Sequence, residues 1–317
     1  MADATYELTF AREQRGPFET RQQLARAVKT GRSERVAVGV YLPTAIWESL
    51  GPRAKYLARV RAVAETRKNR PVLSHWSAAA VHDLPIVGDW PREVHTIVNP
   101  TSGGRSRNDV VKHSMMLGDT DVLEIDGLLV TTVARTVLDI AATNDFRSAV
   151  VATDQALHVD RFGRGAPLTT KSELWQLWER RMPFGGHART RAVIEFGETN
   201  ADTPLESVSR VNMRVIGCPR PILQSSFSDY LGLIGETDFN WPRFALLGEA
   251  DGDRKYLDEA YRSGRTVEQV MVDEKVREDR LRALPRGVSR WRWKTAINPA
   301  ILRAKLSDAG LPMGIRW

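Results

Sequence analysis

Cysteine is nearly absent from this chain of 317 residues, because Cys218 is the only one. A single cysteine excludes an internal disulfide and any zinc site built from several thiolates, and it suits a reducing compartment. No stretch of eighteen apolar residues occurs, so no membrane span is expected. The first ten residues, MADATYELTF, have neither the basic nor the apolar segment of a secretory signal. We therefore expect a cytoplasmic, globular protein without membrane association.

Positive charge is present, but it is confined to one part of the chain. Residues 1–75 hold fourteen Lys and Arg against seven Asp and Glu, whereas residues 76–317 hold thirty-two of each. The whole net charge of +7 therefore lies in the first quarter. A basic segment ahead of a neutral body is typical of a nucleic-acid-binding protein with other modules attached. A scattered, solvated surface charge is the alternative, and the local pattern has to decide between the two.

The first seventy residues have the order of elements of a winged helix. Thr20 can cap a helix that starts at Arg21 and ends at Gly31. Residues 35–43 predict two short strands that bend at Gly39. A helix over 52–68 follows, and the first helix of the domain has to come from residues 6–14.

This pattern predicts contacts with double-stranded DNA. Arg and Gln side chains can bond base edges in a major groove, and Arg also binds phosphates. The DNA-binding candidates are Arg21, Gln22, Arg26 and Lys29 on the helix, with Arg32 and Arg35 beside the following turn. An amphipathic helix with an ordinary solvated face is the alternative interpretation.

The second region, residues 71–165, predicts an α/β domain. A helix over 74–82 capped by Ser74, strands over 94–98 and 110–115, and helices from 131 and 149 follow one another. Gly103-Gly104 lacks the lysine and the spacing of a phosphate-binding loop, so it is interpreted as a turn. The four histidines of the region match no zinc signature, so we interpret them as structural residues with satisfied hydrogen bonds. They are His75, His82, His95 and His113.

The chain after a helical linker at 166–200 carries the clearest chemical pattern. Residues 201–317 predict a helix, a strand, a hairpin, a strand with an acidic end, a helix and a strand, the order of a restriction-endonuclease-like mixed sheet with flanking helices. Asp238 and Glu249 fall on neighbouring strands, and Glu249 and Asp251 share a face. Clustered carboxylates hold Mg²⁺ in such a fold. Glu206, Asp238 and Glu249 are the candidate Mg²⁺ ligands.

A basic residue near the nucleophile is the missing part of this pattern. Asp251 stands where a lysine is expected, so Lys255 or Lys275 would have to supply the positive charge. The candidate catalytic residues are Asp238, Glu249, Asp251 and Lys275. The alternative is an exposed junction between a strand and a turn, because Asp and Gly favour turns.

Several segments together resemble a known family. Residues 35–43, 74–82 and 127–139 are similar to actinobacterial AbiEi-like proteins, which are winged-helix regulators and in many cases antitoxins of type IV toxin–antitoxin systems. Residues 203–206, 237–242, 249–252 and 273–281 resemble the Vsr-like endonuclease-type domain that is often fused to them.

The resemblance implies a multidomain α/β (α+β) protein. Its parts would be a winged helix over 1–70, an AbiEi-like domain over 71–165, the linker and a Vsr-like domain over 201–317. It also implies promoter autoregulation and a nucleotidyltransferase-like toxin as partner. Carried over to this chain, the site consists of Asp238, Glu249 and Asp251, with Glu206 and Lys275 in support. Such domains often have Glu-x-Asp-Gly as here, and the resemblance leaves cleavage open.

Three functions follow from these patterns. The first is a DNA-binding, antitoxin-like transcriptional regulator with a nuclease-fold module. The second is a Mg²⁺-dependent endonuclease of the PD-(D/E)xK type that the basic domain targets to DNA. The third is an interaction protein whose C-terminal fold binds a toxin. The regulator should retard DNA in a gel and leave it intact, and the endonuclease should cut DNA in the presence of metal. The interaction protein should do neither but should capture a partner.

Overall fold

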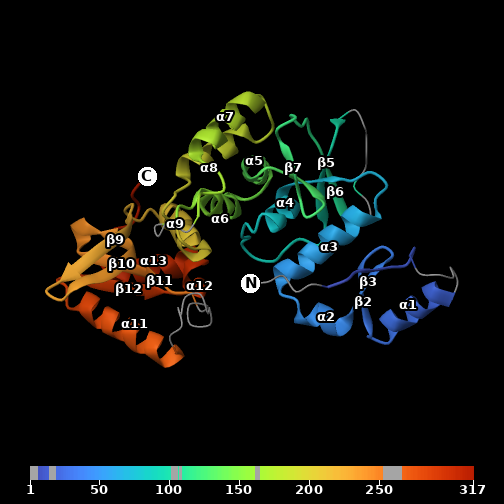
Figure 1. Ribbon diagram of the computed structural model, residues 1–317. Helices are drawn as coiled ribbons and strands as arrows, with labels where there is room; N and C mark the ends of the chain where they lie inside the picture. Colours follow the sequence, from blue (N-terminus) through green and yellow to red (C-terminus); the bar gives the residue numbers. More distant parts are fainter. Residues whose placement is uncertain (1–5, 14–18, 101–105, 107–108, 161–164, 253–265) are drawn as a thin grey trace. The chain divides into compact units, whose positions relative to one another are not determined.

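The structure is a computed structural model that describes residues 6–13, 19–100, 106, 109–160, 165–252 and 266–317; at 19–21, 267, 270 and 271 only the backbone is described. The described chain is mixed α/β with three sheets (Figure 1). It forms two compact units. Unit 1 comprises residues 1–152 and 168–195, and unit 2 comprises residues 153–167 and 196–317. The segments 1–70 and 71–152 thus belong to one unit, together with most of the segment expected as a linker.

The N-terminal sheet of unit 1 has the order β1-β3-β2 and is antiparallel throughout. Its strands are β1 (Thr9–Phe10), β2 (Ser33–Ala37) and β3 (Val40–Pro43). The expectation of a helix over residues 6–14 is wrong, because this segment contributes β1, which pairs with β3. Phe10 is buried and Tyr6 and Leu8 pack against the same core. Such alternation is the period of a strand, not of a helix.

The helices of this part follow the sequence pattern more closely. They are α1 (Glu19–Lys29), α2 (Thr44–Ser49) and α3 (Pro52–Thr66). The start of α1 precedes Thr20, so the predicted cap at this residue is wrong. The predicted end at Gly31 is confirmed: its φ is +69°, its N–H donates to Val28 O, and Arg32 N donates to Ala27 O. These bonds satisfy the last carbonyls of the helix.

A five-stranded mixed sheet with the order β6-β5-β4-β8-β7 forms the rest of the core of unit 1. Its strands are β4 (Val72–Leu73), β5 (Val94–Val98), β6 (Val110–Ser114), β7 (Val122–Ile125) and β8 (Leu128–Thr131). The associated helices are α4 (His75–Val81), α5 (Val133–Thr143), α6 (Phe146–Leu157), α7 (Lys171–Arg181) and α8 (His187–Phe196).

Caps at two of these helices test the sequence predictions directly. Thr132 caps α5, since its side chain accepts a hydrogen bond from Arg135 N. Ser74 precedes α4 as expected but makes no capping hydrogen bond; its hydroxyl lies 3.0 Å from Nδ1 of His75 instead. The side-chain cap predicted for Ser74 is therefore wrong. The loop with Gly103-Gly104 lies outside the described residues.

Unit 2 contains a four-stranded sheet with the order β12-β11-β10-β9. Its elements are α9 (Pro204–Ile216), β9 (Ile222–Asp229), β10 (Gly232–Trp241), β11 (Leu246–Ala250), α11 (Val267–Arg282), β12 (Gly287–Trp291), α12 (Trp293–Ala296) and α13 (Pro299–Asp308). Strands β9, β10 and β11 form an antiparallel meander, and β12 adds parallel to β11. The predicted order of helix, strand, hairpin, strand, helix and strand is confirmed.

Candidate functional site

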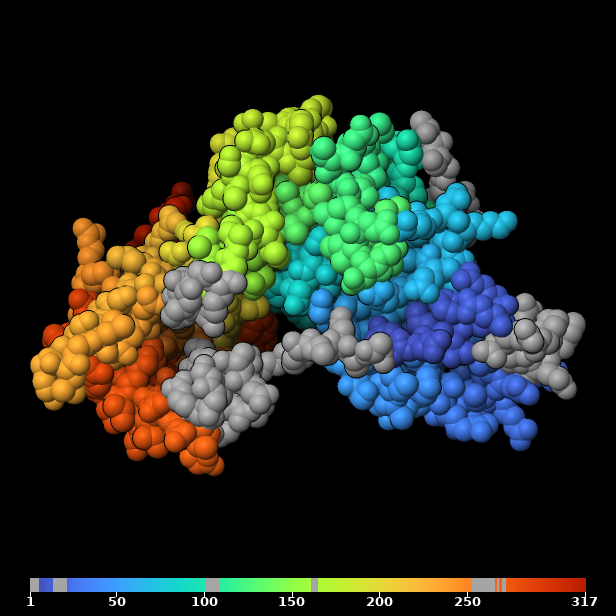
Figure 2. All heavy atoms as spheres, viewed as in Figure 1, coloured from blue at the N-terminus to red at the C-terminus, as the bar shows by residue number. Residues whose placement is uncertain are grey.

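The DNA-binding candidates of unit 1 lie at its surface. Gln22, Arg26 and Lys29 are exposed on α1, and Arg32 and Arg35 are exposed beside and within β2. Arg21 belongs to α1, but its side chain lies outside the described residues. Figure 2 shows the blue N-terminal elements that carry these residues as open surface. The described side chains at these positions are therefore exposed to solvent.

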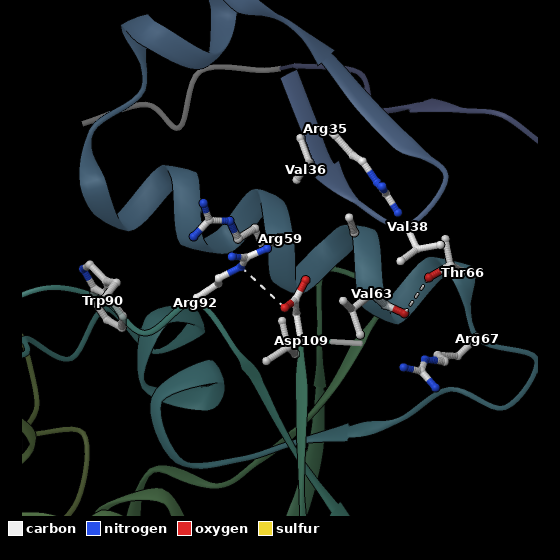
Figure 3. A pocket seen from close by; sticks show the side chains of 12 residues that line it. Arg35, Val36, Val38, Arg59, Val63, Thr66, Arg67, Trp90, Arg92 and Asp109 are labelled. Carbon is white, nitrogen blue, oxygen red and sulfur yellow. Dashed lines mark hydrogen bonds and ion pairs between the residues drawn. The ribbon is translucent and has the colours of Figure 1, made fainter. Parts of the chain in front are cut away.

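A cleft of about 730 Å³ beside β2 gathers further cations (Figure 3). Its lining includes Arg35 of β2, Arg59 of α3, Arg67 directly after α3, and Arg92 of the segment before β5. Among the described residues of the lining Asp109 is the one acid, and its carboxylate lies 3.4 Å from Nε of Arg92. Four guanidinium groups against one carboxylate give the cleft a positive potential.

Aromatic side chains brace this cleft. Trp90 lines it and stacks on Tyr56 with ring centroids 5.2 Å apart. The Tyr56 hydroxyl bonds Ser77 Oγ at 2.8 Å and donates to Glu93 O at 2.9 Å. Arg59 lies over the ring of Trp47, 5.3 Å from its centroid. Because these contacts fix the wall, the arginines project from a rigid surface. The sequence analysis missed Arg59, Arg67 and Arg92, although the net charge of residues 1–75 signals the first two.

In unit 2 the structure brings Asp238 and Glu249 together. Phe239 of β10 pairs with Gly248 of β11, so the antiparallel register sets Asp238 opposite Glu249. Both side chains are buried. Oδ2 of Asp238 accepts a hydrogen bond from Ala250 N at 2.6 Å. The predicted pairing of these two acids across a short hairpin is confirmed.

Arginines from α11 and β12 occupy the space beside these acids. Arg277 donates from Nη2 to Oε1 of Glu249 at 2.9 Å and from Nη1 to Glu274 at 3.0 Å. Arg290 holds both oxygens of Asp251, at 2.8 and 2.9 Å, and also bonds Glu274 at 3.0 Å. The two guanidinium groups thus bridge the acids of β11 to those of α11, and sequence reasoning identified neither.

Of the two candidate lysines, one lies within the described residues. Lys275 lies on α11 and is exposed. Lys255 lies outside the described residues. A guanidinium group close to the acids therefore comes from Arg277, two residues after Lys275. In sequence, its spacing of three residues from Glu274 on one helix was the available signal.

Glu206 is buried on α9 and is held by three donors. Thr203 Oγ1 donates to Oε1 at 2.8 Å, and Asp202 N and Gln224 Nε2 donate to Oε2 at 3.0 and 2.8 Å. Burial and the neighbouring charge of Asp238 raise the pKa of Glu206 to about 8. Near neutral pH this side chain is then largely a carboxylic acid, which is a poor metal ligand. A bound dication would lower this pKa again.

Three of the four histidines set aside in sequence also lie together. Within the residues that the structure describes, a group of three possible metal ligands with nitrogens or oxygens inside 4.8 Å of one another is formed by His75, His95 and His113, not by Glu206, Asp238 and Glu249. His82 satisfies its hydrogen bonding as expected, since its Nε2 lies 2.7 Å from Thr131 O. Nε2 of His75 is buried without a hydrogen-bond partner, so the expectation of a satisfied histidine is wrong there.

Comparison with known proteins identifies no relative of this chain. No protein-family model, no curated protein and no solved structure matches the chain. Among the described helices, none combines the length and the apolar character needed to cross a membrane.

Proposed function

We propose that this protein is a DNA-binding regulator that contacts double-stranded DNA through unit 1. The cleft lined by four arginines and a single acid is the observation that carries the proposal. Guanidinium groups bind phosphates through strong, charge-assisted hydrogen bonds, and phosphate contacts dominate the affinity of proteins for DNA. Arg35 lines the cleft and belongs to the same hairpin that follows α1. The cleft thus continues the exposed cations of the N-terminal elements.

The order α1, β2, β3 supports a winged-helix arrangement of this surface. In that arrangement α1 enters a major groove, where Gln22 and Arg26 can bond base edges. The hairpin then follows the backbone, with Arg32 and Arg35 at phosphates. Reading by α1 gives sequence selectivity, and the arginines of the hairpin and the cleft add affinity for any sequence.

For unit 2 we infer a nuclease-like module that does not cut DNA. The order β12-β11-β10-β9 with flanking α9 and α11 supports a restriction-endonuclease-like core, in which Asp238 and Glu249 would be the metal ligands. Arg277, however, holds Oε1 of Glu249 at 2.9 Å. A divalent cation has to displace this buried ion pair before it can use the carboxylate, which favours a regulator over an enzyme.

Metal-dependent cleavage of DNA is the second candidate, and Arg277 is also the observation that favours it. A cation beside the two acids can stabilise the negative charge that develops on a phosphate during hydrolysis. Arg277 would then replace the lysine that the pattern of residues 238–251 lacks. In this reading Asp238 and Glu249 would hold the Mg²⁺, and the guanidinium group of Arg277 would contact the phosphate.

A gel mobility-shift assay tests the proposal that the protein is a DNA-binding regulator. The full chain is titrated onto its own upstream DNA and onto a scrambled fragment of equal length, as wild type and as Arg26→Gln. A contact from Arg26 to a base should cost about 1–3 kcal/mol and reduce the preference for the upstream fragment. Arg282→Gln is the matched control, because Arg282 is an exposed arginine on α11 of unit 2. Equal losses in both variants, or no preference in the wild type, would contradict the proposal.

Incubation of plasmid with Mg²⁺ or Mn²⁺, with EDTA as the blank, separates the two candidates. The regulator leaves DNA intact under all conditions. The endonuclease cuts with metal, and both Asp238→Ala and Arg277→Ala abolish the cut. Cleavage that Asp238→Ala retains would point to a contaminating enzyme.

A further inference from the structure

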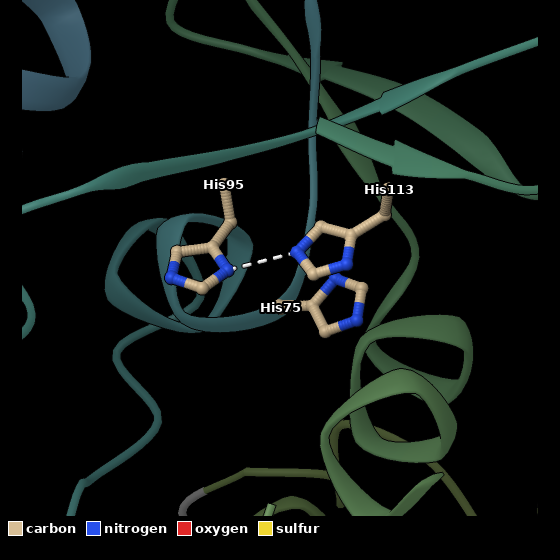
Figure 4. A group of neighbouring side chains, drawn as sticks. All are labelled: His75, His95 and His113. Carbon is tan, nitrogen blue, oxygen red and sulfur yellow. Dashed lines mark hydrogen bonds between the residues drawn. The ribbon is translucent and has the colours of Figure 1, made fainter. Parts of the chain in front are cut away.

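Three histidine side chains from different elements of unit 1 lie next to one another (Figure 4). His95 lies on β5 and His113 on the neighbouring parallel strand β6, where His95 pairs with Val111. Because residues two apart on a strand share a face, His95 and His113 project from the same face of the sheet. His75 is the first residue of α4, which contacts β5.

The spacing of the ring nitrogens is close to that around a metal ion. One nitrogen of each ring lies within 4.8 Å of the other two. Nδ1 of His95 and Nε2 of His113 are 2.9 Å apart. Around tetrahedral Zn²⁺ with Zn–N bonds of about 2.0–2.1 Å, two ligand nitrogens lie roughly 3.3 Å apart. A small opening of the gap between His95 and His113 would therefore admit the ion.

His75 supplies a buried nitrogen that the protein itself leaves unsatisfied. The residue is 1% exposed, and its Nε2 has no hydrogen-bond partner. Its Nδ1 lies 3.0 Å from Ser74 Oγ, the kind of contact that fixes the tautomer and orientation of a metal-binding histidine. Its φ of +49° is uncommon for a residue other than glycine. Strained backbone of this kind concentrates at functional sites.

One ring has to turn for a metal to bind. The rings of His75 and His113 stack with centroids 3.6 Å apart and planes 16° from parallel. An imidazole binds a metal along the ring plane, so two stacked rings cannot both point at one ion. Because His113 is the less buried of the two, we infer that its ring turns out of the stack and that His75 keeps its contact with Ser74.

Access and charge also permit a dication here. His95 and His113 are only partly buried, so the group is open on one side. The arginines whose positive charge acts on His75 are Arg135 and Arg181. Asp139 pairs with Arg135 at 3.0 Å and with Arg181 at 2.9 Å, and Asp121 pairs with Arg135 at 2.6 Å. These two carboxylates balance the two arginines.

We propose that His75, His95 and His113 bind a transition-metal dication of the Zn²⁺ class, with water in the remaining coordination position. Imidazole nitrogen suits Zn²⁺, Co²⁺, Ni²⁺ and Cu²⁺, whereas Mg²⁺ and Ca²⁺ require oxygen ligands. Three protein ligands and one open position match the ligand number of an accessible zinc site. The ion would tie α4 to β5 and β6.

Calorimetric titration of Zn²⁺ into the metal-free full chain tests the site, with Co²⁺ as a spectroscopic probe. We expect one Zn²⁺ per chain, a rise in Tm with Zn²⁺ concentration, and the visible absorption of tetrahedral Co²⁺. His113→Ala should weaken Zn²⁺ binding by at least about tenfold, the loss typical even for residues that only orient a ligand. His187→Ala is the matched control, because His187 is an exposed histidine of the same unit.

A variant at His75 covers the case in which His113→Ala does not fold. His75→Asn keeps a residue that tolerates positive φ and removes the ring, and circular dichroism checks the fold. Loss of Zn²⁺ binding in a folded His75→Asn or His113→Ala chain, with His187→Ala unchanged, supports the proposal. Absence of Zn²⁺ binding in the wild type, or unchanged binding in both variants, overturns it.

Discussion

The ion pair between Glu249 and Arg277 illustrates how single residues decide the chemistry of unit 2. Glu249 is 2% exposed, so its negative charge needs a partner inside the protein. Arg277 provides one through its guanidinium group, which also donates to Glu236 O at 2.6 Å. A metal ion at the same carboxylate would perform the same neutralisation. Arg277 therefore supplies a cation at one of the carboxylates that the sequence analysis predicted as a Mg²⁺ ligand.

Removal of Arg277 should destabilise unit 2 strongly. Arg277→Met removes the guanidinium group that pairs with the buried Glu249, and breaking a buried pair in this way costs about 3–5 kcal/mol. The double variant Arg277→Met with Glu249→Gln should recover much of that loss, because it removes both charges of the pair. Urea unfolding measures both. Lys275→Met on the same helix is the control and should stay within about 0.5 kcal/mol of the wild type, because Lys275 is exposed. A small effect of Arg277→Met would contradict this account.

The raised pKa of Glu206 predicts a pH dependence of stability. Between its ordinary pKa near 4.5 and the folded value of about 8, the folded chain keeps a proton that the unfolded chain has released. The contribution of Glu206 to the free energy of unfolding therefore falls as pH rises through this window. Glu206→Gln removes this dependence, so its stability relative to the wild type should rise by at least about 1 kcal/mol from pH 5 to pH 8.

The control for this experiment is Asp308→Asn, an exposed acid at the end of α13. Its difference from the wild type should stay flat over the same range of pH. A flat difference for Glu206→Gln as well would show that Glu206 is ionised in the folded chain at neutral pH.

At the scale of helices and strands, the sequence predicted the helix ends that depend on hydrogen bonds between neighbouring residues. Gly31 ends α1 as expected, and the helix expected from residue 131 is capped by Thr132, because both rely on backbone groups within a few residues. The prediction of a helix over residues 6–14 is wrong because it rested on the number of helices in a winged helix. The alternation of apolar residues within the segment itself indicates a strand. Its strand pairs Thr9 with Tyr41, a contact between distant parts of the chain. The cap predicted at Ser74 is absent, and the Ser74 hydroxyl group contacts the ring of the neighbouring His75 instead.

The cap of α5 offers a test at this scale. Thr132→Ala removes the oxygen that accepts from Arg135 N at 3.3 Å and should lower the free energy of unfolding by about 1 kcal/mol. Thr132→Ser keeps that oxygen and should lie within a few tenths of a kcal/mol of the wild type. Thermal unfolding of the three chains compares them. Equal losses in Thr132→Ala and Thr132→Ser would assign the effect to the lost methyl group instead of the cap.

At the scale of the whole molecule, the sequence predicted the mixed α/β class and the pairing of Asp238 with Glu249 but not the partners of these acids. The strand spacing sets the two acids opposite each other, so their proximity follows from a local hairpin. Arg290 reaches Asp251 from β12, 39 residues later in the chain, and no spacing rule gives that contact. The sequence did not predict the histidine group for the same reason. His75, His95 and His113 come together only when α4, β5 and β6 fold against one another.

The confinement of the net charge to residues 1–75 predicts where the salt dependence of DNA binding arises. Each phosphate contact adds about 0.9 to the slope of log affinity against log salt, so Arg35→Gln with Arg67→Gln should reduce that slope by about 1.8. Both residues are exposed and line the cleft. Arg243→Gln with Arg282→Gln removes the same charge from exposed positions of unit 2 and should leave the slope unchanged. Binding to a random duplex at a series of KCl concentrations gives the slopes. Equal reductions in the two double variants would mean that net charge, rather than the arginine cleft, governs binding.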